Sequence, residues 1–165
     1  MKQAKTNSMR KLDQQNINYS VNTYEISDNH MNGESVAEKV GVDVAQVYKT
    51  LVLENIEHAH FVFVIPVNAS LDMKSAAKVV NEKKLYLIPL DDLKQVTGYV
   101  RGGCSPIGMK RQFPTVIDQQ AEMMDSIYVS GGERGIQIKI KVENLIEGTK
   151  AQIHKVTQDE QDEQY

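Results

Sequence analysis

The sequence predicts an α+β protein whose strands form a mixed sheet. Segments that alternate apolar and polar residues outnumber segments with helical spacing, and the two kinds do not follow each other in a regular order. The chain has 165 residues, of which 41% are hydrophobic, which suffices for one domain with its own core. We expect this domain over residues 1–156, and a disordered acidic tail over residues 157–165.

The N-terminal quarter of the chain predicts two helices around one strand. Residues 6–16 place Met9 and Leu12 on one helical face, and residues 19–26 alternate as a strand does. After a loop rich in turn-forming residues, a second helical segment stops at Gly41, because glycine favours the C-terminus of a helix.

The centre of the chain predicts the main strands of the sheet. Residues 47–54 and 60–67 are strongly apolar, and the segment NIEHA between them has the length of a hairpin connection. Asp72 then caps a helix, and residues 84–89 predict a further strand. A short helix follows and ends near Gly98.

The C-terminal third predicts strands on both sides of a glycine turn. After a loop over residues 99–114, residues 115–118 and 126–130 have the composition of strands. The turn leads into residues 136–142, in which isoleucines alternate with polar residues. A last helical turn precedes a short edge strand over residues 151–156.

Composition narrows the class of function. The net charge of −3 argues against binding of nucleic acid through overall charge, but the tail TQDEQDEQY contributes four acids, so the rest is near neutral. A single cysteine excludes an internal disulfide framework. No apolar run has the length of a membrane span, and the N-terminus lacks the apolar stretch of a signal peptide. We therefore expect a cytoplasmic monomer that contacts no membrane.

Lys49 interrupts the apolar face of the strand over residues 47–54. Residues two apart in a strand share a face, so its side chain is expected beside Val47, Leu51 and Leu53. Either the aliphatic stem snorkels past them to water, or the ammonium group reaches into a cleft to hold a phosphate, carboxylate or carbonyl oxygen. The pattern alone favours snorkelling.

The loop RGGCSPIG is a second candidate for a binding site. Gly102 and Gly103 let the backbone approach a ligand closely, and Ser105 offers a hydroxyl group before a proline. The bases that flank the loop, of which Arg101 is the nearest, favour an anionic partner. An ordinary turn with a solvated basic face explains the same residues equally well.

The segment YVSGGERG is the third candidate. Ser130 ends a strand, and Gly131 and Gly132 follow at once, as in a tight hairpin. A functional interpretation adds a serine hydroxyl and exposed backbone N–H groups at the mouth of a cleft. Cys104 has no histidine in a recognisable partner pattern, and the histidines lack metal-ligand spacing, so we expect neither a metal nor a cofactor.

Five strings, VYKTLV, DMKSAAKVV, TGYVRGGCSPIG, PTVID and IYVSGGERG, occur in a familiar order and spacing. In these strings the chain resembles the YbaK family of aminoacyl-tRNA deacylases, which are related to the editing domain inserted in bacterial prolyl-tRNA synthetases. The resemblance covers about residues 5–150. It implies a mixed, barrel-like β-sheet with surrounding helices, and an enzyme that removes misattached cysteine from tRNA for proline.

The resemblance also implies roles for individual residues. Lys49 matches the family's essential lysine, which we expect to anchor the aminoacyl ester or the terminal ribose and phosphate. Backbone N–H groups of the RGGCSPIG loop would lie near the ester carbonyl. No protein nucleophile is implied, because the thiol of the cysteinyl substrate attacks the ester. The residues expected to bind substrate are Tyr24, Thr50, Gly102, Gly103, Ser105, Ser130, Gly131 and Gly132.

Two positions depart from the family pattern. Asn32 stands where an aromatic residue is frequent, and Gln137 stands where an acid is frequent, so another amino acid can be preferred. The alternatives are a deacylase for alanine or serine, or a non-catalytic module that binds tRNA or the synthetase. The implied partners are the 3′ end of aminoacyl-tRNA and, in a transient complex, prolyl-tRNA synthetase.

Overall fold

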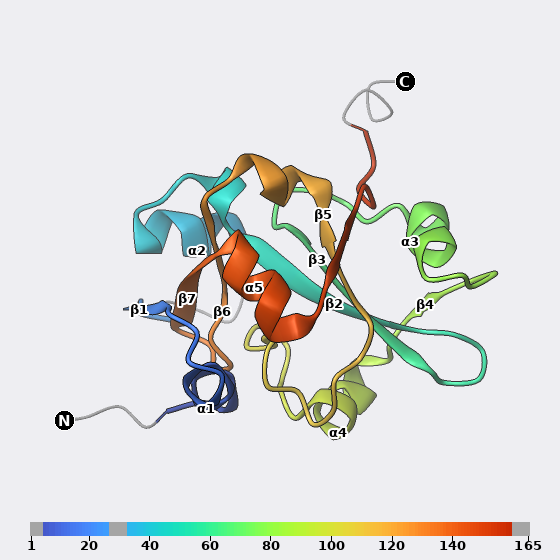
Figure 1. Ribbon diagram of the computed structural model, residues 1–165, viewed down its shortest axis with the longest axis horizontal. Coiled ribbons are helices and arrows are strands. Elements are labelled where there is room, and N and C mark those ends of the chain that lie inside the picture. The colour runs from blue at the N-terminus through green and yellow to red at the C-terminus, as the bar shows by residue number, and fades with distance from the viewer. Residues whose placement is uncertain (1–4, 27–32, 160–165) are drawn as a thin grey trace.

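A computed structural model of the protein describes residues 5–26 and 33–159. Within these ranges the strands form two sheets, shown in Figure 1. The smaller sheet has the order β1 (Ser20–Thr23), β7 (Ile136–Lys141), β6 (Ser126–Ser130). The larger has the order β4 (Tyr86–Leu87), β2 (Tyr48–Glu54), β3 (His60–Pro66), β5 (Thr115–Asp118), β8 (Gln152–His154). The pairs β3–β5 and β5–β8 are parallel and the others are antiparallel, so the predicted α+β class with a mixed sheet is confirmed.

The two sheets meet where β2 begins. An isolated parallel bridge joins Val47 to Tyr128 of β6, and beyond it the two strands form no further ladder. The strands therefore do not close into the barrel that the resemblance suggested. Instead, the gap that opens beyond the bridge lies between the end of β6 and the first half of β2.

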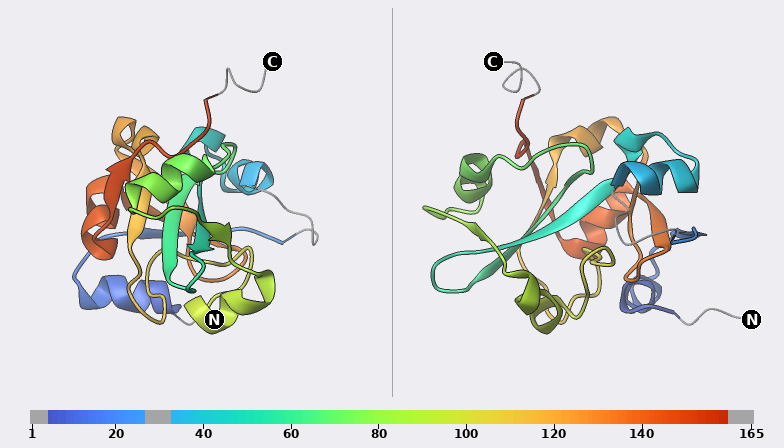
Figure 2. Two further views of the ribbon diagram at one scale, coloured as in Figure 1. Left: turned by 90° about the vertical axis from the view of Figure 1, so that its right-hand side faces the viewer. Right: turned by 180° about the vertical axis from the view of Figure 1, so that it is seen from behind.

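Helices lie around the outside of the sheets, as the views in Figure 2 show. Their caps match the expected signals: the Asp72 side chain accepts from two N–H groups of α3, and Gly41 after α2 has a φ of +83°. Short 3-10 turns join the elements at residues 44–46, 90–92 and 119–123, of which the last was not predicted. The helices are α1 (Asn7–Gln14), α2 (Gly33–Val40), α3 (Met73–Val79), α4 (Leu93–Thr97) and α5 (Val142–Thr149).

The central strands are buried on both faces. Val52 of β2 packs in the main core with the isoleucines of β7, whereas Leu53 packs with Phe63 and with Ala76 of α3. Burial on both faces explains why β2 and β3 have nearly continuous apolar runs. The predicted inward residues of α1, Met9 and Leu12, belong to the main core.

Some predicted boundaries differ from the observed ones. β4 is only Tyr86–Leu87, because it pairs with β2 at only two positions. Thr157, which was expected in the disordered tail, is 3% exposed and bridges to Leu71, and the N–H of Gln158 donates to Ser70. The first two residues of the expected tail therefore contact the folded part of the chain.

The departure at Asn32 and residues 28–32 of the expected loop lie outside the described residues, as do residues 160–165. Among the helices of the described part, none is both long and apolar enough to cross a bilayer.

Candidate active site

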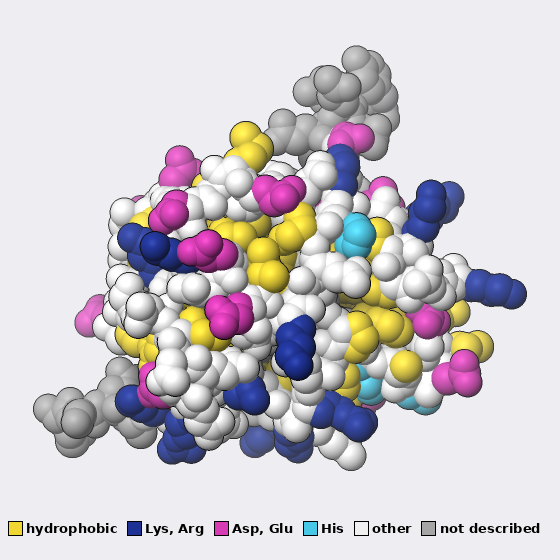
Figure 3. All heavy atoms as spheres, viewed as in Figure 1, with side chains coloured by type: hydrophobic (Ala, Val, Ile, Leu, Met, Phe, Trp, Pro, Cys, Tyr) yellow, Lys and Arg dark blue, Asp and Glu magenta, His cyan; other side chains and the backbone are white. Residues whose placement is uncertain are grey.

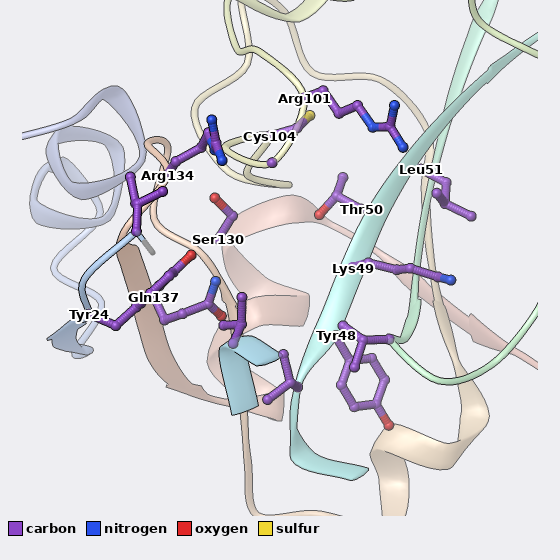
Figure 4. A pocket seen from close by; sticks show the side chains of 15 residues that line it. Tyr24, Tyr48, Lys49, Thr50, Leu51, Arg101, Cys104, Ser130, Arg134 and Gln137 are labelled. Carbon is purple, nitrogen blue, oxygen red and sulfur yellow. The ribbon is translucent and has the colours of Figure 1, made fainter. Parts of the chain in front are cut away.

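A cavity of about 480 Å³ opens between β2 and β6, beyond the bridge that joins them (Figure 4). Its walls come from β2, the segment after β1, the loop before β5, and the β6–β7 connection. Three bases and no acid occur among its described lining residues. The polar and charged lining residues are Tyr24, Tyr48, Lys49, Thr50, Arg101, Ser130, Arg134 and Gln137.

The first half of β2 presents an open edge to this cavity. β4 pairs only with Leu53 and Glu54, so the strand has no ladder on that side before them. The Val52 carbonyl accepts from Ile88, and its backbone groups therefore point away from β3. Backbone direction repeats every two residues in an antiparallel ladder. The N–H group of Thr50 consequently also points away from β3, toward the gap.

Lys49 and Thr50 reach the cavity from opposite faces of β2. Figure 4 shows the Thr50 side chain on the side of Ser130 and the Lys49 side chain on the other side of the strand. Lys49 is half-buried, and no carboxylate in the described part of the chain pairs with it. Burial lowers the pKa of the Lys49 ammonium below its usual range. A charged group without a protein partner thus lies beside a space for an anion or an ester.

Three described lining residues have a buried oxygen atom without a hydrogen-bond partner: Oη of Tyr48, Oγ1 of Thr50 and Oε1 of Gln137. In Figure 4 the Tyr48 hydroxyl points away from Ser130, whereas Thr50 lies on the side of Ser130, and the Gln137 residue is only 6% exposed. Leaving a buried polar group unsatisfied costs about 1–3 kcal/mol, so such groups in a cavity indicate where a ligand supplies the missing partner. Gln137 lies directly opposite Ser130 in the β6–β7 ladder, which brings both residues to the same wall.

Of the predicted residues in the first glycine loop, only Gly102 lines the cavity. Gly103 is not among the lining residues, and its N–H group donates to the Val100 carbonyl over 2.9 Å, so the structure does not place this N–H group at the cavity. Ser105 is fully buried, and its Oγ accepts from the N–H of Ile107. This hydroxyl therefore holds the turn and does not line the cavity.

In the second glycine loop, Ser130 lines the cavity, but Gly131 and Gly132 do not. The N–H of Gly131 donates to Ile136, and the N–H of Gly132 donates to the Ser130 hydroxyl. The expected exposed N–H groups are therefore already bonded within the loop. The Gly131 carbonyl accepts from the Ser8 hydroxyl, which ties this wall to α1. The predicted Tyr24 and Thr50 both line the cavity.

Sequence reasoning missed Arg134 and assigned no role to Cys104, although both line the cavity. A Cβ atom on Gly102 would lie 3.3 Å from Cγ of Arg134, so this arginine packs across the glycine. The position of Gln137 opposite Ser130 could have been inferred from the sequence, because the short turn between β6 and β7 fixes the pairing of these strands. The approach of Arg134 to Gly102 joins two distant loops and has no signal in the sequence.

The lining residues contain no acid–base pair. The described histidines lie outside the lining, and no group of three His, Cys, Asp or Glu in the described ranges could hold a metal ion. Burial raises the pKa of the Cys104 thiol to about 11, so this thiol is protonated at neutral pH. The arrangement suits binding and electrostatic stabilisation of an anion or ester, and it lacks an activated protein nucleophile.

Comparisons with known proteins agree with this chemistry. The family model described as Aminoacyl-tRNA editing domain matches residues 29–147. A protein of Enterococcus faecalis, a presumed Cys-tRNA(Pro)/Cys-tRNA(Cys) deacylase named EbsC, is 42% identical over 155 residues, which is 94% of each chain.

Solved structures with the same fold are more distant in sequence. The structure of a presumed trans-editing enzyme for prolyl-tRNA synthetase is 21% identical, with a TM-score of 0.78 over 86% of this chain and 87% of that one. The structure of the hypothetical protein APE2540 is 18% identical, with a TM-score of 0.83 over 92% of this chain and 99% of that one. At these identities the likeness shows the fold alone.

Proposed function

The chain belongs to the aminoacyl-tRNA editing domain family and is an aminoacyl-tRNA deacylase, and from this premise we propose that it removes cysteine wrongly attached to tRNA for proline. The name of the relative from Enterococcus faecalis supports this choice of substrate. The observation that carries the proposal is a cavity of about 480 Å³ with three bases and no acid among its described lining residues. Oγ1 of Thr50 and Oε1 of Gln137, both on lining residues, have no hydrogen-bond partner within the protein.

The unpartnered oxygen atoms suit the α-ammonium group of an amino acid. Oε1 of Gln137 and Oγ1 of Thr50 both accept hydrogen bonds, and an ammonium group carries only donors. With the ammonium group there, the ester lies beside Lys49 and the Thr50 N–H group. Charge that develops on the carbonyl oxygen is then stabilised by groups that are already in place.

The proposed reaction uses the substrate as its own nucleophile. The cysteinyl sulfur attacks the ester carbonyl carbon, the bond to the ribose oxygen breaks, and the thiol proton passes to that oxygen. Water then opens the cyclic thioester to free cysteine. This route fits a cavity whose only thiol, Cys104, stays protonated because burial raises its pKa to about 11. The protein supplies orientation and electrostatics.

Editing of this kind is needed because binding alone separates similar amino acids poorly. A difference of one small group in a synthetase pocket is worth only about 1–3 kcal/mol. We place the reaction in the cytoplasm and beside prolyl-tRNA synthetase, as a transient partner of a monomeric deacylase. Esters of alanine or serine are the second candidate substrates, since the neutral Gln137 stands where the family frequently has an acid.

The test is deacylation of a panel of Cys-, Ala- and Ser-tRNA(Pro) by the wild type and by Lys49→Ala. We expect Cys-tRNA(Pro) to be hydrolysed fastest and Lys49→Ala to be inactive, while Lys83→Ala, an exposed lysine outside the cavity, retains activity. Faster hydrolysis of another aminoacyl-tRNA would change the substrate and leave the site in place. Binding of tRNA without hydrolysis would favour the non-catalytic module.

A further inference from the structure

We propose that the rim of this cavity binds the phosphate group on the 5′ side of the terminal adenosine, with Arg101 as its main ligand. The inference rests on the proposed function, because it takes an aminoacyl ester of that adenosine as the group inside the cavity. It chooses between the two roles that were open for the lysine: Lys49 serves the ester, and the rim arginine serves the phosphate.

The exposure of the lining residues sets the direction in which a substrate enters. Val47 and Gln137 are 2% and 6% exposed, so they form the floor. Arg101, Gly102 and Arg134 are exposed and form the rim. An aminoacyl group that reaches the unpartnered oxygen of Gln137 therefore leaves its nucleotide at the rim, where the first phosphate of the chain must lie.

The rim carries two guanidinium groups from different loops. Arg101 precedes Gly102, and Arg134 packs across the same glycine, since an added Cβ would lie 3.3 Å from Cγ of Arg134. In Figure 4 the two side chains lie at the same end of the cavity, on either side of Cys104. Guanidinium groups bind phosphate oxygens through two parallel N–H donors, and no described lining residue supplies a competing carboxylate.

The other two bases near this loop, Lys110 and Arg111, are not among the described residues that line the cavity. Nζ of Lys110 donates to the Gln95 carbonyl over 3.0 Å and so is engaged in holding α4, and Arg111 lies outside the cavity lining. Figure 3 shows further basic side chains along the lower edge of one face, over α1 and α4. Such a surface attracts a tRNA backbone without regard to sequence. The role of the rim must therefore be tested with a substrate that fits the cavity and its rim but is too small to reach this basic surface.

The experiment compares the cysteine ester of adenosine with the cysteine ester of adenosine 5′-monophosphate, as rates above the uncatalysed background. Alanine esters replace them if the tRNA panel selects alanine. We expect the wild type to prefer the phosphorylated ester about tenfold in kcat/KM, through KM, as one charge-assisted phosphate contact at an exposed rim predicts. In Arg101→Gln this ratio should fall toward one, and Arg101→Lys should restore part of it.

Arg111→Gln is the matched control, because it removes the same charge from the same loop outside the cavity. It should retain the wild-type ratio. If Arg101→Gln and Arg111→Gln reduce the preference for the phosphorylated ester equally, the proposal is overturned, because the preference then comes from the overall positive charge of the loop and not from a contact with Arg101. A wild type that hydrolyses both esters equally would overturn it while the proposed function stands. Hydrolysis of neither ester, nor of any tRNA in the panel, would count against the proposed function itself.

Discussion

The ammonium group of Lys49 lies half-buried beside the cavity without a carboxylate partner in the described part of the chain. Substitution Lys49→Met retains the length of the side chain and removes its charge. We expect deacylation to fall at least about hundredfold, because a preorganised group that stabilises the reacting oxygen is lost. The free energy of unfolding, measured by chemical denaturation, should stay equal or rise, since a desolvated charge is removed. A clear loss of stability would instead show that the lysine is structural.

The lowered pKa of Lys49 also predicts a dependence of stability on pH. Its folded pKa lies below the unfolded one, so between the two values the unfolded chain binds more protons and this residue's contribution to stability rises with pH. Below the folded pKa the burial penalty is fully present. The difference in unfolding free energy between Lys49→Met and wild type should therefore shrink as pH rises toward the usual lysine range. A difference that is independent of pH up to that range would contradict the assigned burial effect.

At Gln137, as at Lys49, we expect a substitution to change stability and function in opposite directions. Gln137→Leu removes a buried oxygen without a partner and retains the volume, so we expect the free energy of unfolding to rise by up to about 1 kcal/mol. The same substitution should raise KM about tenfold, because the α-ammonium group loses an acceptor. Lower stability with unchanged KM would mean that the amide has an internal partner and no contact with substrate. Gln120→Leu, whose side chain contacts Thr157 away from the cavity, controls for loss of an amide.

At the residue scale, the sequence singled out candidate residues by a broken pattern, by glycine-rich loops and by the family resemblance, which together supplied Tyr24, Thr50, Gly102 and Ser130 of the lining. Lys49 was identified because it interrupts an apolar face, and Gln137 because it departs from the family pattern. Arg134 was missed because its place depends on the approach of two loops that are distant in sequence. The bond of the Gly103 N–H group to Val100 could not be predicted, because composition indicates that a loop turns but not which N–H groups are bonded within the turn.

Among the elements, α1 supports the cavity wall from outside. The Thr6 and Ser8 hydroxyls both donate to the Gly131 carbonyl, directly after Ser130. Either single substitution, Thr6→Val or Ser8→Ala, leaves one donor, whereas the double variant leaves a buried carbonyl without a side-chain partner. We expect the double variant to lose about 1–3 kcal/mol of unfolding free energy, more than the sum of the singles. A double-mutant cycle with deacylation assays tests this, and strict additivity would contradict a shared acceptor.

The elements themselves were largely predictable, but their partners were not. Apolar runs identified β2 and β3 and alternation identified β7, and the short NIEHA connection correctly predicted that β2 and β3 form a hairpin. Alternation states which face of a strand is buried and contains no information on which distant strand pairs with it. The pairing of β1 with β7, the parallel pairing of β5 with β8 and the division into two sheets therefore came only from the structure. The open edge of β2, on which the site depends, is a consequence of that division.

At the scale of the whole molecule, a buried carboxylate in the larger sheet holds the segment that follows the edge strand β8. Asp118 at the end of β5 is fully buried, and it accepts from the N–H of Val156 and from the hydroxyl of Thr157. Its other oxygen accepts from the N–H of Gln120 in the turn that follows β5. Thr157 and Gln158, the first two residues of the expected tail TQDEQDEQY, are therefore both bonded to the folded part of the chain.

Truncation tests where the domain ends. A chain of residues 1–155 leaves the Asp118 carboxylate buried with only the Gln120 partner and removes Val156, which is fully buried in the second core cluster. We expect a loss of about 3–5 kcal/mol in unfolding free energy, the range found when a buried charge loses its partners. A chain of residues 1–159 retains these contacts and should unfold like the full chain.

If the 1–155 chain does not fold, the point variant Thr157→Val still tests the contact. It removes one hydrogen bond to Asp118 and should lower the free energy of unfolding by about 1–2 kcal/mol. Equal stability of all four chains would mean that the contacts of residues 156–159 do not stabilise the domain, and it would leave the hydrogen bonds of the Asp118 carboxylate to them without an energetic role.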